Sequence, residues 1–164
     1  HRDLHSFPTR RSSNLRFCTC TGKSVEEMYQ IFNKQSGFLG VSEVSNDSRD
    51  VLAAVEKGDP KAILANKLFI RRIADFIGQY YVRLGGVDAI IFSAGIGENS
   101  YEIRESICKE ISPALGLEID YEKNHGKRGV EVVISNPESK VVVVVIPTDE
   151  EVMIARDTYA FYKK

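Results

Sequence analysis

A pair of glycines stands between two segments of different periodicity. Gly95-Ile96-Gly97 follows an apolar run at residues 88–93 and precedes helical spacing from Ser100. Glycine tolerates positive φ and lacks the Cβ that would keep a phosphate or a sugar away, and the first N–H groups of a helix attract anions. The third glycine of the dinucleotide fingerprint would fall at Ser100. The pattern therefore predicts either a nucleotide-contacting turn of another kind or an ordinary turn between a strand and a helix.

Two polar residues complete this turn and favour a binding role. Glu98 and Asn99 follow the glycines directly, and a helix cap formed by Asn99 needs no acid before it. A purely structural alternative makes one of them the cap and the other a solvated charge. The candidate nucleotide-binding residues of the turn are Gly95, Ile96, Gly97, Glu98 and Asn99.

A cluster of acids follows the valine run at residues 141–145. Thr148 and Glu151 have the spacing of a capping box, in which Asp149 and Glu150 would only complement the helix dipole. Acids at a strand end also suit Mg²⁺, which takes one or two carboxylates and keeps several waters. The two interpretations are compatible, because a capping box leaves Glu150 free. Residue types and spacing therefore leave both the cap and a Mg²⁺ site open for this segment.

A third polar segment is Asn46-Asp47-Ser48-Arg49-Asp50. Its residue types predict a helix start with a surface ion pair, which carries little energetic weight. Spacing alone does not select it as a binding site, and no residue of the chain is assigned a catalytic role.

Length and composition limit the class of protein. The chain has 164 residues, 43% of them hydrophobic and 27% charged, with a formal net charge of −1. These values are typical of one globular domain, and they lack the basic excess that a nucleic-acid-binding surface requires. No apolar stretch of about 18 residues predicts a membrane span. Three cysteines fit neither a closed disulfide set nor a zinc pattern, so a reducing, cytoplasmic setting is expected.

The first sixteen residues differ from the rest. Residues 1–16 hold four arginines against one aspartate, without an initiator Met or apolar periodicity. They resemble the translation of a sequencing adapter more than a protein terminus, with a transit peptide as the alternative. We therefore expect a non-native or disordered leader at 1–16 and one domain at 17–164.

Helical patterns fill the first half of the chain. Apolar spacing predicts helices at residues 25–35, from about 46 to Gly58, and from Asp59-Pro60 to Gly85-Gly86. Ser24 has the place of an N-cap for the first helix. Residues 38–45 are short, mixed and glycine-containing, which predicts a connection.

Strands alternate with helices in the second half. Residues 88–93, 130–135 and 140–146 are predicted strands, the first buried on both faces and the valine run central. Helices are expected at 100–111 and 148–162. This order of elements is typical of an α/β layer architecture.

Several motifs in the same order resemble the acetate kinase family. They are Gly37-Phe-Leu-Gly-Val-Ser42 with Ser45-Asn-Asp-Ser-Arg-Asp50, Gly85-Gly86-Val-Asp88 with Phe92-Ser-Ala-Gly-Ile-Gly-Glu-Asn-Ser100, Arg128-Gly129, and Pro147-Thr-Asp-Glu-Glu-Val-Met-Ile-Ala-Arg156. The resemblance runs from about Thr21 to the C-terminus. It implies the C-terminal domain of an α/β protein with the ribonuclease H-like, actin-like ATPase fold of acetate and sugar kinases, heat-shock chaperones and actin.

The resemblance also implies an activity and its residues. The family transfers the γ-phosphoryl of ATP to acetate, reversibly and with Mg²⁺, giving acetyl phosphate and ADP in a cytoplasmic homodimer. Asp47, Ser48 and Arg49 match its nucleotide-contacting triplet. The segment from Gly95 to Asn99 matches a second nucleotide loop, and Glu150 matches its magnesium-associated glutamate. Neither nucleic acid nor a membrane is an expected partner.

The resemblance covers only part of a family member, about its C-terminal 40%. The catalytic acid, the phosphoryl-holding arginines and histidine and the carboxylate pocket would lie in an N-terminal domain that this chain lacks. Phosphoryl transfer depends on positioning and charge stabilisation from both sides, so we expect the isolated chain to be inactive. Alternatives are a propionate kinase and a non-catalytic nucleotide-binding or dimerisation module.

Overall fold

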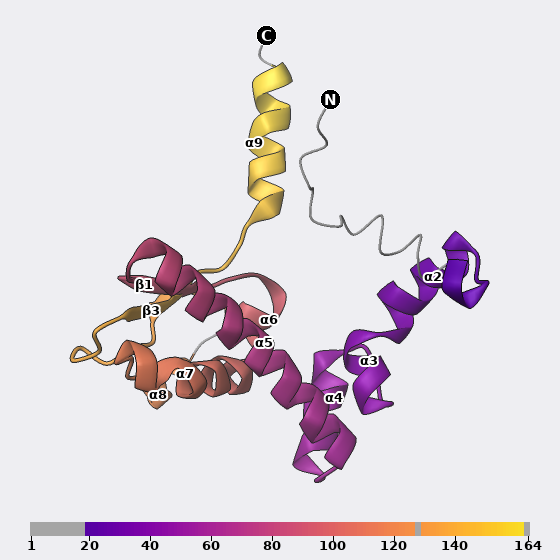
Figure 1. Cartoon of the computed structure of the whole chain (residues 1–164). Helices are drawn as coiled ribbons and strands as arrows, with labels where there is room; N and C mark the ends of the chain where they lie inside the picture. Colours follow the sequence, from indigo (N-terminus) through magenta and orange to yellow (C-terminus); the bar gives the residue numbers. More distant parts are fainter. Residues whose placement is uncertain (1–18, 127–128, 163–164) are drawn as a thin grey trace, which may run out of the picture. The chain divides into compact units, whose positions relative to one another are not determined.

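The computed structural model describes residues 19–126 and 129–162, and Figure 1 gives the order of its elements. Internal contacts divide the chain into two compact units, with the boundary between Phe69 and Ile70. Each unit is described by itself. The predicted leader, residues 1–16, lies outside the described residues.

The described part of the first unit consists of helices and the loops that join them. It holds α2 (Val25–Gln30), a π-helical turn (Ile31–Gln35), α3 (Gly37–Ser42), α4 (Ser48–Glu56) and the first part of α5 (Pro60–Leu84). The predicted N-cap is confirmed, because the Ser24 hydroxyl accepts from the Glu27 N–H and the Glu27 carboxylate accepts from the Ser24 N–H. The single helix predicted over 25–35 is α-helical only as far as Gln30.

The connection predicted at residues 38–45 is wrong, because most of it forms α3. The reason lies in the core of the first unit. Phe38 and Val41, three residues apart, pack against a buried cluster formed by Val51, Ala62 and Ala65. This apolar spacing places one side of α3 on α4 and α5, which outweighs the glycines that favour a loop.

Helix α5 begins and ends as its sequence predicts. The Asp59 carboxylate accepts from the backbone N–H groups of Lys61 and Ala62, and the helix stops before Gly85, whose φ is 72°. Although α5 runs for 25 residues, no helix within the described ranges combines the length and apolarity that a membrane span needs.

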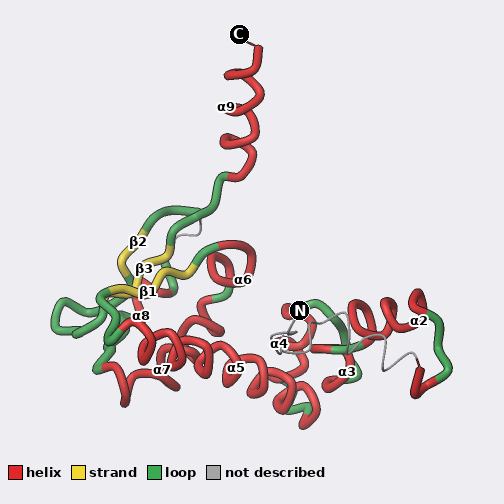
Figure 2. Tube along the Cα trace, turned by 45° about the horizontal axis from the view of Figure 1, so that its top comes forward, coloured by secondary structure: helices red, strands yellow, loops and turns green. Residues whose placement is uncertain are grey.

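The second unit combines a small sheet with helices. After the rest of α5 come β1 (Ala89–Phe92), α6 (Ala94–Asn99), α7 (Tyr101–Leu115), α8 (Tyr121–Asn124), β2 (Val132–Val133), β3 (Val142–Val145) and α9 (Glu150–Tyr162). The strands are yellow in Figure 2. The chain is therefore mixed α/β, as predicted.

The valine run forms the central strand, which confirms its predicted place. The sheet order is β1-β3-β2, with β1 parallel and β2 antiparallel to β3. In the parallel pair, Ala89 lies opposite Val142 and Phe92 opposite Val145. Both strands therefore end at the same edge of the sheet, and the segments that follow them start there.

The expectation that both faces of β1 are buried is wrong. Ile91 is 58% exposed, and Val142 and Val133 on the same face are exposed as well. Phe92 and Val143 on the other face are buried. Side chains alternate between the faces of a strand, and a continuous apolar run does not reveal how many faces are covered.

This alternation predicts very different costs for two neighbouring valines. Val143 is fully buried and Val142 is 44% exposed. Val143→Ala should lower the free energy of unfolding by about 2 kcal/mol, since two methyl groups leave the core and a cavity remains. Val142→Ala, the matched control, should cost less than about 1 kcal/mol. Urea denaturation followed by circular dichroism measures both, and equal losses would contradict the register.

Candidate functional site

The predicted glycine turn is the short helix α6, which follows the end of β1. A positive φ, which glycine tolerates best, occurs here at Ala94, at 57°, and not at Gly95 or Gly97. A Cβ added at Gly97 would lie 3.4 Å from the carbonyl carbon of Phe92, so this glycine allows α6 to pack closely on β1. A Cβ added at Gly95 would meet nothing within 4 Å. The chain itself therefore gives no steric reason for a glycine at position 95.

The cap of the following helix is not formed by either polar residue of the turn. Ser100 is the N-cap of α7, and its hydroxyl accepts from the Ile103 N–H. Asn99 instead donates to the carbonyl of Gly95 at 2.8 Å, which closes α6 on itself. Ile96 is half-buried, and its carbonyl accepts from the Ser100 N–H.

A buried arginine holds the carbonyl side of the turn. Arg104, on α7, is 6% exposed and donates to the carbonyls of Gly97 and Glu98, both at 2.9 Å. It also donates to the side-chain oxygen and to the carbonyl of Asn124, both at 2.8 Å. Asn124 donates in turn to the carbonyl of Tyr101. This network fixes α6 on α7 and α8.

The Glu98 carboxylate faces the segment that follows β3. One of its oxygens, Oε1, accepts from the Thr148 N–H at 2.7 Å and from the Thr148 hydroxyl at 2.9 Å. These bonds lower the pKa of Glu98. The side chain is therefore ionised at neutral pH and already has partners inside the chain.

The predicted capping box of α9 is wrong. Thr148 bonds to Glu98, and Asp149 accepts from the Val152 N–H at 3.0 Å in the manner of an N-cap. The partner that determines this choice lies 50 residues earlier in the chain. Glu150 begins α9, two residues after Thr148.

The candidate metal residue, Glu150, is of a chemical type that suits Mg²⁺ bound jointly with phosphates. Among the side chains that the structure describes, three from His, Cys, Asp or Glu never gather into a potential metal cluster. Mg²⁺ usually takes one or two carboxylates and completes its shell with water and substrate phosphates. Glutamate, the residue type at position 150 where α9 begins, offers oxygen donors of this kind.

Asp47, Ser48 and Arg49 belong to the first unit, and α6 and Glu150 to the second. Asp47 caps α4 by accepting from the Arg49 N–H at 2.9 Å, and Ser48 is the first residue of that helix. The Arg49 guanidinium donates to the Asp47 carboxylate, which lowers the pKa of Asp47 to about 2. Arg49 itself is 87% exposed.

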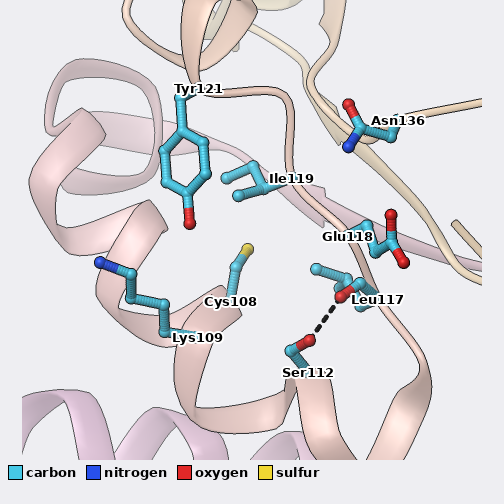
Figure 3. A pocket seen from close by; sticks show the side chains of 8 residues that line it. All are labelled: Cys108, Lys109, Ser112, Leu117, Glu118, Ile119, Tyr121 and Asn136. Carbon is cyan, nitrogen blue, oxygen red and sulfur yellow. Dashed lines mark hydrogen bonds between the residues drawn. The ribbon is translucent and has the colours of Figure 1, made fainter.

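The second unit also holds an open cavity of about 270 Å³, whose lining includes none of the predicted site residues. Figure 3 shows Cys108 and Lys109 of α7 beside it, with Tyr121, Glu118 and Asn136 around them. Burial raises the pKa of Cys108 to about 12, so its thiol is not a nucleophile at neutral pH. Cys20 is also a free thiol, and Cys18 lies outside the described residues.

Two segments that the sequence singled out, the glycine turn and residues 147–151, thus contact each other within the second unit. Glu98 of the turn contacts Thr148, which belongs to the acidic segment at residues 147–151. The sequence did not predict this contact or the hydrogen bonds between Arg104 and Asn124. One feature of the sequence indicates that Arg104 is buried and paired. Arg104 lies on the same helical stripe as Ile107 and Cys108, where a charge requires a specific partner.

The fold and the carboxyl edge of its sheet together indicate a class of protein. A parallel strand pair with a glycine-containing turn at its carboxyl edge is typical of α/β proteins that bind ligands there. Among solved structures, Porphyromonas gingivalis acetate kinase is similar to this chain, with a TM-score of 0.78 and 42% sequence identity. The match covers 90% of this chain and 37% of that kinase. A propionate kinase from Francisella tularensis is also similar, with a TM-score of 0.74 and 38% sequence identity, over 87% of this chain and 36% of that kinase. The chain therefore has part of the actin-like ATPase fold of these kinases.

The sequence comparisons agree with the structural ones. Residues 15–156 match the acetokinase family. Acetate kinase from Bacteroides thetaiotaomicron is 48% identical over 143 residues, 87% of this chain and 36% of the relative. Acetate kinase from Streptococcus gordonii is 54% identical over 142 residues, which are 86% of this chain and 35% of that relative. The chain belongs to the acetokinase family, and it spans about a third of the length of these relatives.

Proposed function

We propose that this chain is the C-terminal, nucleotide-holding part of an acetate kinase. The whole enzyme would transfer the γ-phosphoryl of ATP to acetate, reversibly, and produce acetyl phosphate and ADP. Its setting would be the cytoplasm, and its assembly a homodimer. The observation that carries this proposal is α6, a glycine turn with open space at Gly95 at the carboxyl edge of two parallel strands, in a chain of the acetokinase family.

The chain's own residues would bind and orient the nucleotide. The backbone at Gly95 allows a flat or bulky group to approach more closely than any side chain would permit. Arg49 has five N–H donors, and the Asp47 carboxylate engages only those on Nε and one terminal nitrogen. The remaining donors suit a phosphate or sugar oxygen.

Glu150 would hold Mg²⁺ together with the nucleotide phosphates. The ion, when bound, would neutralise charge that develops on the transferring phosphoryl group. Glu150 is the first residue of α9, which follows β3 along the chain. Catalytic groups are expected outside this chain, so the 164-residue protein should bind nucleotide without turning it over.

A propionate kinase is the second candidate, because the Francisella tularensis propionate kinase shares this fold at 38% identity. The nucleotide role is the same in both, and the acceptor carboxylate pocket is expected outside this chain. A non-catalytic nucleotide-binding or dimerisation module is the remaining alternative.

Calorimetric titration of the 164-residue chain with ATP, with and without Mg²⁺, tests the proposal. Weak binding is expected, strengthened by Mg²⁺ in the wild type but not in Glu150→Ala. Gly97→Val should abolish binding, since its side chain would press on Phe92 and displace the turn. Absence of ATP binding to the folded wild-type chain would refute the nucleotide role. Acetate-dependent release of ADP from the purified chain would refute the expected lack of turnover.

A further inference from the structure

The end of β1 and the end of β3 are tied together by side chains as well as by the ladder. The Ile146 N–H donates to the carbonyl of Phe92 at 2.9 Å, which extends the parallel pairing by one residue. The Ser93 hydroxyl donates to the carbonyl of Ile146 at 2.9 Å. Glu98 then binds Thr148 through both its N–H and its hydroxyl. Three successive contacts therefore guide the chain from β3 toward α9.

The Glu98–Thr148 contact is the last of these ties before Glu150. Thr148 donates both of its polar hydrogens to one carboxylate oxygen. A carboxylate that accepts several N–H and O–H groups is held in one orientation. It would also repel nucleotide phosphates, which carry the same sign of charge.

We propose that Glu98 is a positioning residue, which holds Thr148 so that Glu150 is presented to the nucleotide that lies against α6. The inference rests on the proposed nucleotide and Mg²⁺ roles. It replaces the expectation that Glu98 contacts the nucleotide directly. Its consequence is energetic coupling between the two sites, because loss of the tie frees the segment that carries Glu150 without changing the backbone at Gly95.

Independent use of Asp149 supports this division of roles. Asp149 caps α9 through the Val152 N–H, so Thr148 is not needed for the start of the helix. The Thr148 hydroxyl is instead directed to the turn. Removal of this hydroxyl should therefore leave α9 capped and loosen only its connection to α6.

The test measures ATP affinity of the 164-residue chain with and without Mg²⁺. Glu98→Ala should reduce the strengthening by Mg²⁺ by about fivefold, while affinity without Mg²⁺ stays within about twofold of wild type. Thr148→Val should have a smaller effect in the same direction, and Thr148→Ser should retain the wild-type value. Glu102→Ala removes an equal charge from the first turn of α7 and should change neither affinity.

Two results would overturn the proposal. The first is a loss of affinity without Mg²⁺ in Glu98→Ala that matches the loss with Mg²⁺, which would indicate direct contact with the nucleotide. The second is an unchanged Mg²⁺ effect in both Glu98→Ala and Thr148→Val.

Amide hydrogen exchange separates this proposal from the nucleotide role itself. In the ligand-free chain, the Thr148 amide should exchange about tenfold faster in Glu98→Ala than in the wild type, because its acceptor is gone. If the wild type binds no ATP but the exchange rate rises as expected, the nucleotide role fails and the tie stands. Equal exchange rates would refute the tie, whatever the chain binds.

Discussion

Arg104→Met is expected to lower the free energy of unfolding by about 3 kcal/mol. Methionine fills similar space but donates nothing to the carbonyls of Gly97 and Glu98 or to the two oxygens of Asn124. These acceptors lie around a nearly buried guanidinium and would be left poorly satisfied. Urea denaturation followed by circular dichroism measures the loss.

Two further variants test whether the loss of stability in Arg104→Met comes from the hydrogen bonds of the guanidinium. Arg104→Lys keeps the charge, but one ammonium cannot span acceptors on both α6 and α8, so an intermediate loss is expected. Arg71→Met removes an exposed arginine that pairs with Asp75 and Glu110, and should leave stability near wild type. If Arg104→Met were as mild as Arg71→Met, Arg104 would not be an anchor of the turn.

The helices were predictable from the sequence because their signals are local. Ser24, Asp59 and Gly85 mark helix ends by interactions within a few residues, and the structure confirms each of them. Helix α3 was missed because its stability comes from packing on Val51, which no local pattern records. Tertiary contacts outweigh propensity in such short helices.

The candidate site was predictable in its segments and not in its contacts. The glycine turn and the acidic segment were selected because their residue types suit nucleotide and metal chemistry. Asp149 rather than Thr148 caps α9 because Thr148 binds Glu98, which lies 50 residues earlier in the chain. The same contact determines which group the Glu98 carboxylate binds. Residue spacing predicts which groups are available, whereas the parallel pairing of β1 with β3 determines which of them meet.

Gly95→Ala is expected to change stability and binding in opposite directions. An added Cβ meets nothing within 4 Å, and alanine is the better helix former, so stability should rise by about 0.5–1 kcal/mol. If the open space is where the nucleotide lies, ATP affinity should fall about tenfold, which corresponds to about 1.4 kcal/mol. Denaturation and calorimetric titration of the same preparation measure both changes.

Gly78→Ala in α5 is the matched control. Gly78 is also helical and exposed, and a Cβ added there meets nothing within 4 Å. Its replacement should give a similar gain in stability and leave ATP affinity unchanged, because the helix-propensity effect is the same and Gly78 is outside the proposed nucleotide site. Unchanged affinity in Gly95→Ala would show that the nucleotide does not need this glycine, even if the chain binds ATP. Weakened affinity in both variants would indicate a general effect of stiffening rather than the exclusion of a ligand from one place.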